Sequence, residues 1–292
     1  MAVGENASTI YGTDPERNHY MIQWDTHMHT TFSGDGHVSP SDMAKTAREK
    51  GLDGIIFTDH LDWDYMSEPG RFDLDIPAYY SEMKELQKNK NDDLPEILIG
   101  IELGLQEHLV SRHRQILAEY EFDQVIGSIH QVDGLDPYYE SYYKGKDIYE
   151  AYEDYLGAAI SNLSLFPEID TFGHLDYVSR YGIRHFGAET GTLRYEDHKA
   201  SIDKILEFLI TKSIALEVNT GAFRCEMTEP NPSYDIIRRY YEMGGRLITI
   251  GADAHYAEHI ALRFEEVRDR LSEIGFTQYA VFKKREPIML SL

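Results

Sequence analysis

The chain has 292 residues, of which 42% are hydrophobic, so it is long enough to bury a substantial core. Its 28 Lys and Arg residues are outnumbered by 51 Asp and Glu residues, which gives a formal net charge of −23 at pH 7. This balance argues against nucleic acid or an anionic membrane surface as a partner, because both are bound mainly through Lys and Arg. Cys225 is the single cysteine, which excludes an internal disulfide and a zinc site with several cysteines.

The sequence shows no targeting segment and no membrane span. No run approaches the roughly 18 apolar residues that cross a bilayer. Residues 1–20 lack the basic region and the apolar region of a secretory signal. We therefore expect a cytoplasmic protein in which residues 1–292 form a single domain and residues 1–20 form an N-terminal extension. The sequence carries no signal for an oligomeric state.

Seven short apolar runs recur along the chain, and each is followed by polar or charged residues. Their length and their content of Ile, Val, Leu and Phe are typical of buried strands in a parallel sheet. The runs cover residues 21–29, 53–60, 96–103, 122–130, 169–176, 214–221 and 246–255.

A helical pattern follows each of these runs. The first, at residues 39–51, has Ser39 as its N-cap, Pro40 at its first helical position and Gly51 at its C-terminal end. The other predicted helices cover residues 77–90, 109–120, 147–163, 196–212, 233–243 and 257–274. Seven strands that alternate with seven helices predict a closed or nearly closed α/β barrel. The irregular stretches 61–76 and 131–146 are expected to be active-site loops.

Six of the 13 histidines lie at the ends of the predicted strands, where βα barrels carry their catalytic residues. A histidine in that place is by itself more often a hydrogen-bonding residue than a ligand. On a strand, however, residues i and i+2 point to the same face, so His27 and His29 can bind one ion. Asp253 and His255 repeat this arrangement. Buried charges are costly unless they are paired or bind metal, so the joint pattern indicates a metal site.

The candidate ligands are numerous enough for more than one ion. One ion takes about four protein ligands, and a carboxylate can bridge two ions. Imidazole and carboxylate together suit Zn, Mn or Fe, so we predict two to three divalent ions of these elements. The candidates are His27, His29, Asp35, His60, Glu102, His130, His174, Asp253 and His255.

These residues lie in short motifs that resemble the polymerase-and-histidinol-phosphatase (PHP) family of metal-dependent hydrolases. The motifs are DTHMHT (25–30), SGDG (33–36), TDH (58–60), GIE (100–102), SIH (128–130), GHLD (173–176) and ADAH (252–255). Longer stretches are similar to the histidinol-phosphate phosphatase branch, namely 100–108, 128–134, 173–182 and 216–221. The resemblance implies a distorted (β/α)7 TIM-like barrel.

The resemblance also implies how the ligands are divided. A first ion would be held by His27, His29, Glu102 and Asp253, and Glu102 would bridge to a second ion held by His130 and His174. Asp35, His60 and His255 would hold a third, with His37 as an alternative ligand near Asp35.

The function that follows is hydrolysis of a phosphate monoester, L-histidinol phosphate, to L-histidinol and phosphate in histidine biosynthesis. The predicted nucleophile is a hydroxide that bridges the first two ions. Arg180 and Arg224 follow predicted strands and are expected to bind the phosphoryl group, because the arginine fork suits its oxygens. Arg184 and Arg194 are weaker candidates. The candidate proton donors are Asp62, Asp176 and His198.

Two other classes of function fit the same residues. The chain could be a PHP phosphoesterase that acts on another small phosphate ester or on a nucleotide. It could also be a non-catalytic metal-binding PHP module. For the histidinol part of the substrate, Asp64, Asp133 and Tyr138 in the predicted loops are candidates to bind its ammonium and imidazole groups.

Overall fold

The computed structural model describes residues 22–88, 94–187, 191–225 and 227–292, and the predicted extension at residues 1–20 lies outside them. Seven parallel strands in this part form a sheet whose order follows the chain. They are β1 (Trp24–Asp25), β2 (Gly54–Phe57), β4 (Glu96–Gly104), β5 (Gln124–Ser128), β6 (Thr171–Phe172), β7 (Ala215–Asn219) and β8 (Ile248–Gly251). Each overlaps one of the seven predicted runs, so the predicted α/β barrel is confirmed.

The sheet curls until its first and last strands meet. The backbone N–H of Thr26 donates to the carbonyl of Ile250, and the N–H of Asp253 donates to the carbonyl of His27. The chain just beyond β1 and β8 stays paired through a parallel bridge between Met28 and Ala254. The barrel is therefore nearly closed, and the carboxyl ends of all seven strands surround one opening.

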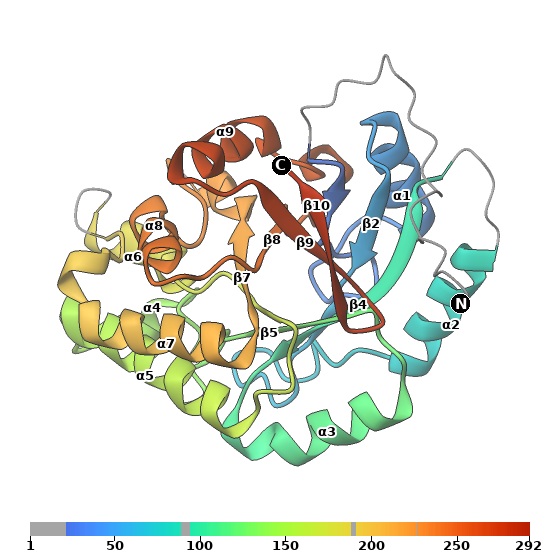
Figure 1. Cartoon of the computed structure of the whole chain (residues 1–292). Coiled ribbons are helices and arrows are strands. Elements are labelled where there is room, and N and C mark those ends of the chain that lie inside the picture. Colours follow the sequence, from blue (N-terminus) through green and yellow to red (C-terminus); the bar gives the residue numbers. More distant parts are fainter. Residues whose placement is uncertain (1–21, 89–93, 188–190, 226) are drawn as a thin grey trace, which may run out of the picture.

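Helices surround the strands on the outside of the barrel (Figure 1). Seven of these helices are α1 (Pro40–Glu49), α2 (Ile76–Lys88), α3 (Val110–Glu119), α5 (Ile148–Leu165), α7 (Lys199–Lys212), α8 (Tyr234–Glu242) and α9 (Phe264–Ile274). Each overlaps a predicted helix. Short 3-10 turns precede or follow some elements: η1 (Glu107–Leu109), η2 (Tyr195–Asp197), η3 (Thr220–Cys225) and η4 (Ala257–His259). Most buried apolar side chains form one cluster between these helices and the strands.

The start of α1 follows the predicted capping chemistry. The Ser39 side chain accepts a hydrogen bond from the N–H of Asp42, and Pro40 stands at the first helical position. Gly51 follows the end of the helix with φ +84°, a conformation that favours glycine. Helix α1, which follows the motifs that contain His27, His29 and Asp35, therefore has well-defined ends.

Two helices lie in segments for which we predicted no regular element, and one short strand begins at the last residue of the predicted run 53–60 and continues into the predicted loop 61–76. α4 (Glu140–Tyr143) is a short helix within the predicted loop 131–146, and α6 (Val178–Phe186) follows the end of β6. β3 (His60–Leu61) pairs with the second half of β4 and places His60 beside Glu102. All three lie at the carboxyl end of the barrel.

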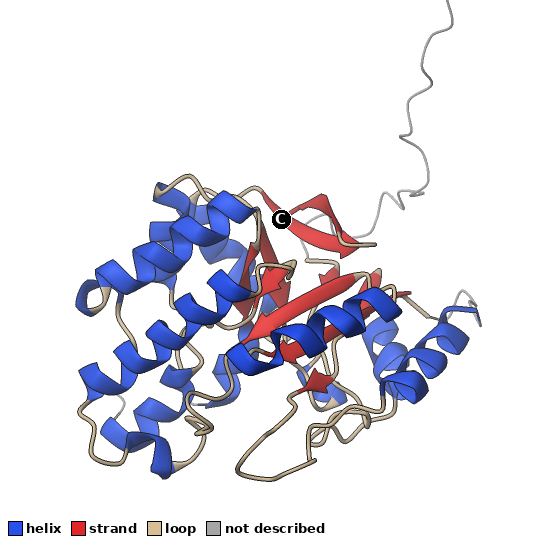
Figure 2. Ribbon diagram, turned by 90° about the horizontal axis from the view of Figure 1, so that it is seen from below, coloured by secondary structure: helices blue, strands red, loops and turns tan. Residues whose placement is uncertain are grey.

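A hairpin of β9 (Gln278–Lys283) and β10 (Glu286–Ser291) covers the other end of the barrel, and the sequence analysis missed it. Its turn contacts the starts of two strands: the N–H of Lys284 donates to the Asp123 carboxylate, and Arg285 forms an ion pair with Asp170. Figures 1 and 2 show the hairpin lying across one end of the strands. Because this end is covered, the carboxyl end is where a substrate can reach the barrel interior.

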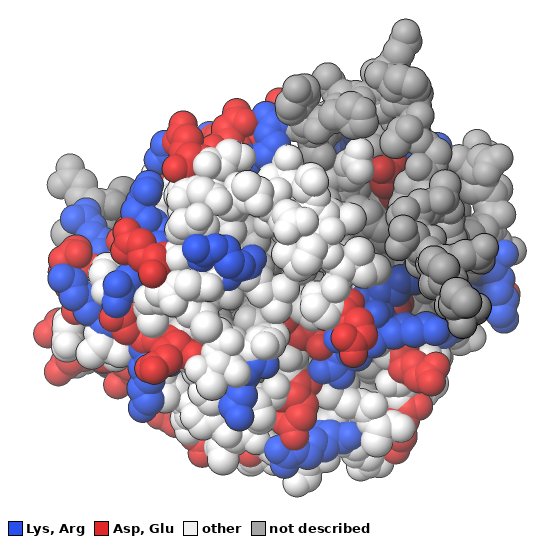
Figure 3. All heavy atoms as spheres, viewed as in Figure 1, with Lys and Arg blue, Asp and Glu red and all other residues white. Residues whose placement is uncertain are grey.

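The face that carries the hairpin has charged side chains of both signs. On this face, Lys and Arg side chains alternate with Asp and Glu side chains and form no single basic patch (Figure 3). None of the described helices is both long enough and apolar enough to cross a bilayer.

Candidate metal centre

The structure brings all nine predicted ligands together at the carboxyl end of the barrel. They come from positions at or just beyond the ends of successive strands, which a closed barrel places around a common centre. Within the described residues, three overlapping groups have donor atoms close enough to share an ion: His27 with His29 and Asp253, His29 with His60 and His255, and His60 with Glu102 and His130. Glu102, on β4, is fully buried and lies between His27 and His29 on one side and His130 and His174 on the other.

A first cluster lies where β1 meets β8. His27 Nε2 is 3.0 Å from His29 Nε2 and 3.3 Å from Glu102 Oε2. Asp253 Oδ1 is 3.3 Å from His29 Nε2 and 3.8 Å from His27 Nε2. Four ligands at the usual zinc distances in a tetrahedron are separated from one another by about 3.3 Å. The distances from each imidazole to the other ligands are therefore close to those of a tetrahedral site.

A second cluster uses the other oxygen of Glu102. Its Oε1 atom is 3.3 Å from His130 Nε2 and 3.0 Å from His174 Nε2, and these two nitrogens are 3.4 Å apart. The three atoms thus have the spacing expected of three ligands to one ion. Because Oε1 and Oε2 of one carboxylate each face a separate group of imidazoles, Glu102 has the geometry of a bridging ligand.

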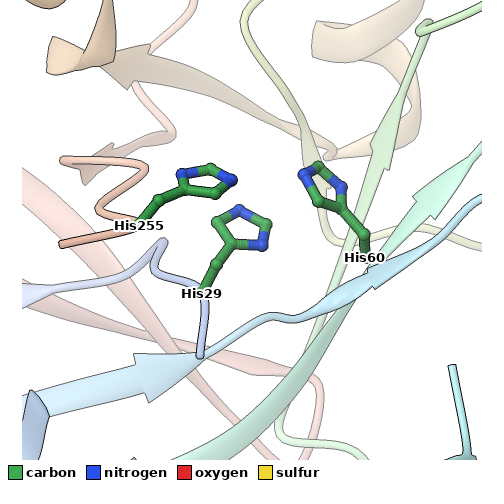
Figure 4. Close-up of side chains that lie close together, drawn as sticks. All are labelled: His29, His60 and His255. Carbon is green, nitrogen blue, oxygen red and sulfur yellow. The ribbon is translucent and has the colours of Figure 1, made fainter. Parts of the chain in front are cut away.

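A third cluster contains Asp35, His60 and His255. Asp35 Oδ2 is 3.2 Å from His255 Nε2, and Asp35 Oδ1 is 3.9 Å from His60 Nε2. Figure 4 shows the rings of His60 and His255 on either side of His29, and the ring of His29 stacks on both at centroid distances of 4.1 and 4.2 Å. His37, the alternative ligand, is exposed and stacks on Tyr256.

The donor set fits bound cations rather than a hydrogen-bonded polar core. Among the described residues, the buried atoms without a hydrogen-bond partner include Glu102 Oε2, Asp35 Oδ1 and His255 Nε2, all within these clusters. Buried polar atoms are rarely left unpaired, and an ion would satisfy all three. Burial, together with His60 and His255, holds the pKa of His29 well below its usual value, whereas Glu217 and Glu102 hold the pKa of His27 well above it despite burial, so an ion would displace a proton from His27.

Buried carboxylates fix the orientation of two of the imidazoles. Glu217 Oε1 lies 2.5 Å from His27 Nδ1, and Asp62 Oδ1 lies 2.6 Å from His130 Nδ1. Each contact leaves the Nε2 atom of the ring facing the clusters. Although burial opposes ionisation, the nearby imidazoles of His130 and His60 lower the pKa of Asp62 to about 2. Asp62 is thus an ionised acceptor, which does not support the prediction that it donates a proton.

Two predicted proton donors lie away from the opening. His198 directs Nδ1 at Glu153, 2.6 Å away, and stacks on Tyr149. Asp176 is fully buried and accepts a hydrogen bond from Asn231. Burial raises the pKa of Asp176 to about 7, but neither residue is among the described residues that line the cavity over the clusters. The geometry therefore does not support direct proton transfer to a substrate by either group.

A cavity of about 340 Å³ opens over the clusters, and both predicted phosphate-binding arginines line it. The buried Arg180 donates to the Asn231 side chain, to Asp253 Oδ2 at 2.8 Å and to Asn219 Oδ1. Arg224 is more accessible and donates from Nη1 to the Asp253 carbonyl. Arg180 thus holds a predicted ligand in place, whereas Arg224 has more of its fork free to face the cavity.

Another part of the cavity lining consists of residues that the sequence analysis did not single out. Tyr65, Phe72, Asp136, Tyr177 and Tyr181 line it. The Tyr65 hydroxyl donates to the Asp136 carboxylate at 2.5 Å. The three residues predicted to bind the ammonium and imidazole groups do not line this cavity. Asp64 and Asp133 line a neighbouring groove, and Tyr138 is 54% exposed and packs edge-on against Tyr181.

Comparisons with known proteins agree with this geometry. The model of the PHP domain family matches residues 25–221. A protein of Clostridium acetobutylicum named "Probable histidinol-phosphatase" is 36% identical over 90% of this chain and 97% of its own length. The histidinol-phosphatase of Lactococcus lactis is 33% identical over 90% of this chain and 95% of its own length.

A solved structure has the same fold over nearly the whole chain. The crystal structure of histidinol phosphate phosphatase from Lactococcus lactis, in complex with zinc, L-histidinol and phosphate, superimposes with a TM-score of 0.81. The two proteins are 31% identical, and the match covers 91% of this chain and 98% of that one.

Proposed function

The chain belongs to the PHP domain family, and from this we propose that it is a metal-dependent phosphomonoesterase that hydrolyses L-histidinol phosphate to L-histidinol and phosphate. The observation that carries the proposal is the position of Glu102, whose two oxygens face two separate groups of imidazoles beneath one cavity. The Lactococcus lactis relative, solved with zinc, L-histidinol and phosphate, supports the choice of substrate.

We propose that the nine side chains hold two to three divalent ions of Zn, Mn or Fe. Each ion would be bound by one of the clusters described above. Divalent ions bound there would lower the pKa of water to near 7 and neutralise charge on the phosphoryl oxygens. The chain itself contributes the fixed geometry. His27 and His130 are held at Nδ1 by buried carboxylates, and Asp253 is held by Arg180. Ligands held in this way need little rearrangement when charge develops.

Arg224 is proposed to bind the phosphoryl group. It lies on η3, directly after β7, and its Nη1 donates to the carbonyl of Asp253, which directs the guanidinium along the cavity wall. The remaining N–H groups of the guanidinium can then donate to two phosphoryl oxygens at once. This places a fixed positive charge beside a site that is rich in carboxylates.

The part of the cavity lining around Asp136 suits the histidinol part of the substrate. Asp136 is a buried carboxyl group between the hydroxyls of Tyr65 and Tyr177, which lie 2.5 and 3.4 Å from its oxygens. A carboxylate among aromatic rings can receive an ammonium group, and the ring faces of Phe72 and Tyr181 can pack against an imidazole. We propose that these residues select an amino alcohol ester over a sugar phosphate.

A substrate panel tests the proposal. The metal-loaded protein is assayed with L-histidinol phosphate, with sugar and nucleotide monophosphates and with a phosphodiester. We expect kcat/KM for L-histidinol phosphate to exceed that for the other monoesters by about 10²-fold or more, since a buried carboxylate left without its ammonium partner costs several kcal/mol. Equal and slow hydrolysis of every monoester would indicate a general phosphatase, and preference for the diester would contradict the proposal.

Two further expectations stay predictions. We propose that the chain is organised as one domain, which the single large cluster of buried apolar residues supports. We also propose that it acts on a small molecule in the cytoplasm and not on nucleic acid or a membrane, in keeping with its net charge of −23.

A further inference from the structure

Glu217 is a charged residue in the interior of the barrel that does not line the substrate cavity. It lies in the middle of β7, between the apolar residues Leu216 and Val218, and its side chain is fully buried. Ionised carboxylates are costly to bury unless hydrogen bonds compensate them. The identity of the groups that compensate Glu217 therefore indicates what the residue does.

One oxygen of Glu217 meets a ligand of the first cluster. Oε1 lies 2.5 Å from His27 Nδ1. An ionised carboxylate can only accept a hydrogen bond, so Nδ1 of His27 carries the ring proton. Nε2, the atom that faces Glu102 and Asp253, is then the ring nitrogen left to bind an ion when one is present. Glu217 thus selects the tautomer of His27 that can bind an ion.

The other oxygen of Glu217 meets a ligand of the second cluster. Oε2 accepts a hydrogen bond of 2.7 Å from the backbone N–H of His174, and a second of 3.1 Å from the Asn219 side chain. The N–H of His174 lies at the end of β6, where the strand passes into the turn that carries the imidazole. The Glu217 carboxylate therefore fixes the chain position from which the His174 ring reaches Glu102.

The backbone around Glu217 leaves room for this arrangement. A Cβ atom on Gly251, in the neighbouring strand β8, would lie 2.3 Å from His27 Cβ and 3.0 Å from Glu217 Oε1. Any other residue at position 251 would push the ring and the carboxylate apart. Glycine at position 251 therefore lets His27 approach β8 closely enough to reach Glu217.

We propose that Glu217 is a positioning residue that couples the first two metal clusters, because one carboxylate sets the tautomer of His27 and the backbone position of His174. The inference rests on the proposed function, since it assumes that the clusters hold ions. It assigns Glu217 no contact with substrate. Its effect is on how tightly the ions are bound and on how the imidazoles face them.

The test is the metal affinity of Glu217→Gln. An amide has one acceptor oxygen, so the variant must turn its NH₂ group toward either His27 Nδ1 or the N–H of His174. With the NH₂ group toward His27, the ring proton moves to Nε2, and His27 can no longer bind an ion through that atom. With the NH₂ group toward His174, the amide and the backbone N–H are two donors that face each other. We expect competition with a chelator to show Zn²⁺ binding that is weaker by about 10–100-fold, with a changed visible absorption spectrum of the Co²⁺-loaded protein.

Two control variants and one measurement on the wild-type protein show whether weaker Zn²⁺ binding in Glu217→Gln comes from the positioning of His27 and His174 or from a general loss of stability. Glu153→Gln removes the same charge from the contact with His198, away from the cavity, and is expected to leave the affinity for Zn²⁺ unchanged. Glu217→Asp keeps the charge but shortens the reach, and is expected to give an intermediate affinity. In the wild-type protein loaded with Zn²⁺, nitrogen NMR is expected to show His27 protonated at Nδ1.

The outcomes distinguish this inference from the proposed function. If the wild-type protein binds no ions, both are overturned. If the wild-type protein binds ions and Glu217→Gln binds them equally well, only the role of Glu217 is overturned, even where the thermal stability of the metal-free variant falls. An unprotonated Nδ1 on His27 in the Zn²⁺-loaded wild-type protein would overturn it without any substitution.

Discussion

Replacing Glu102 with glutamine is expected to lower kcat/KM for L-histidinol phosphate by about 10³-fold or more. The two oxygens of Glu102 lie within 3.5 Å of imidazole nitrogens in both of the first two clusters. An amide has one oxygen and no negative charge, so it can serve one cluster at most and would present N–H groups to the other. The substitution is therefore expected to weaken the binding of both ions and to remove the negative charge between them. Steady-state kinetics with elemental analysis of the same sample would measure it.

The matched control for this substitution is Glu96→Gln. Glu96 lies on the same strand, β4, but at its opposite end, where it pairs with Lys283. That variant is expected to keep normal kinetics, because its carboxylate is far from the cavity-lining residues. Near-normal turnover in Glu102→Gln, with two ions still bound, would show that Glu102 does not bridge the clusters.

The second large effect is expected for Arg224→Ala, which should lower kcat/KM for phosphate monoesters by about 10²-fold. The side chain lines the cavity, and its guanidinium is held by the Asp253 carbonyl. Its removal takes a forked donor and a positive charge from the transferring phosphoryl group. Arg224→Lys restores the charge without the fork and is expected to recover only part of the activity.

Arg184→Ala is the control for Arg224→Ala. Arg184 is exposed, lies over the ring of Tyr181 and is absent from the described residues that line the cavity. Steady-state kinetics of the two variants with L-histidinol phosphate should separate them clearly. If the alanine variants at positions 224 and 184 behave alike, Arg224 does not bind the phosphoryl group.

The predicted ligands could be found from the sequence because of where a parallel barrel places its strand ends. A strand ends where apolar residues stop, and the residues just beyond meet at one opening. His27 and His29 could be paired from their spacing alone. The structure adds the reason why they meet Asp253, which is the parallel bridge between Met28 and Ala254. Such long-range pairing is not visible in a local pattern.

The residues that orient the ligands could not be found in the same way. Glu217 and Asp62 contact His27 and His130 across 190 and 68 positions of the chain. Asp62 was predicted as one of three candidate proton donors, and its contact with His130, which favours the ionised carboxylate, does not support that role. One signal was present for Glu217: a carboxylate within the apolar run at residues 214–221 must find a buried partner.

The hairpin β9–β10 and the helix α6 were missed for different physical reasons. The hairpin contains the charged sequence at residues 283–286, which reads as an exposed loop until Arg285 is seen to pair with Asp170 at the start of β6. Helix α6 is short and carries the buried Arg180, a residue that seldom lies in a core unless it is paired. Tertiary contacts supplied the partner in both cases.

The central claim, that bound divalent ions carry out hydrolysis of L-histidinol phosphate, is tested most directly by one titration. Protein purified without chelator is analysed for its metals, stripped with a chelator and then titrated with Zn²⁺ or Mn²⁺ while phosphate release from L-histidinol phosphate is measured. We expect two or three ions per chain, loss of activity on stripping and its return as two ions rebind. Fewer than two ions per chain, with no activity regained with either metal, would contradict the account.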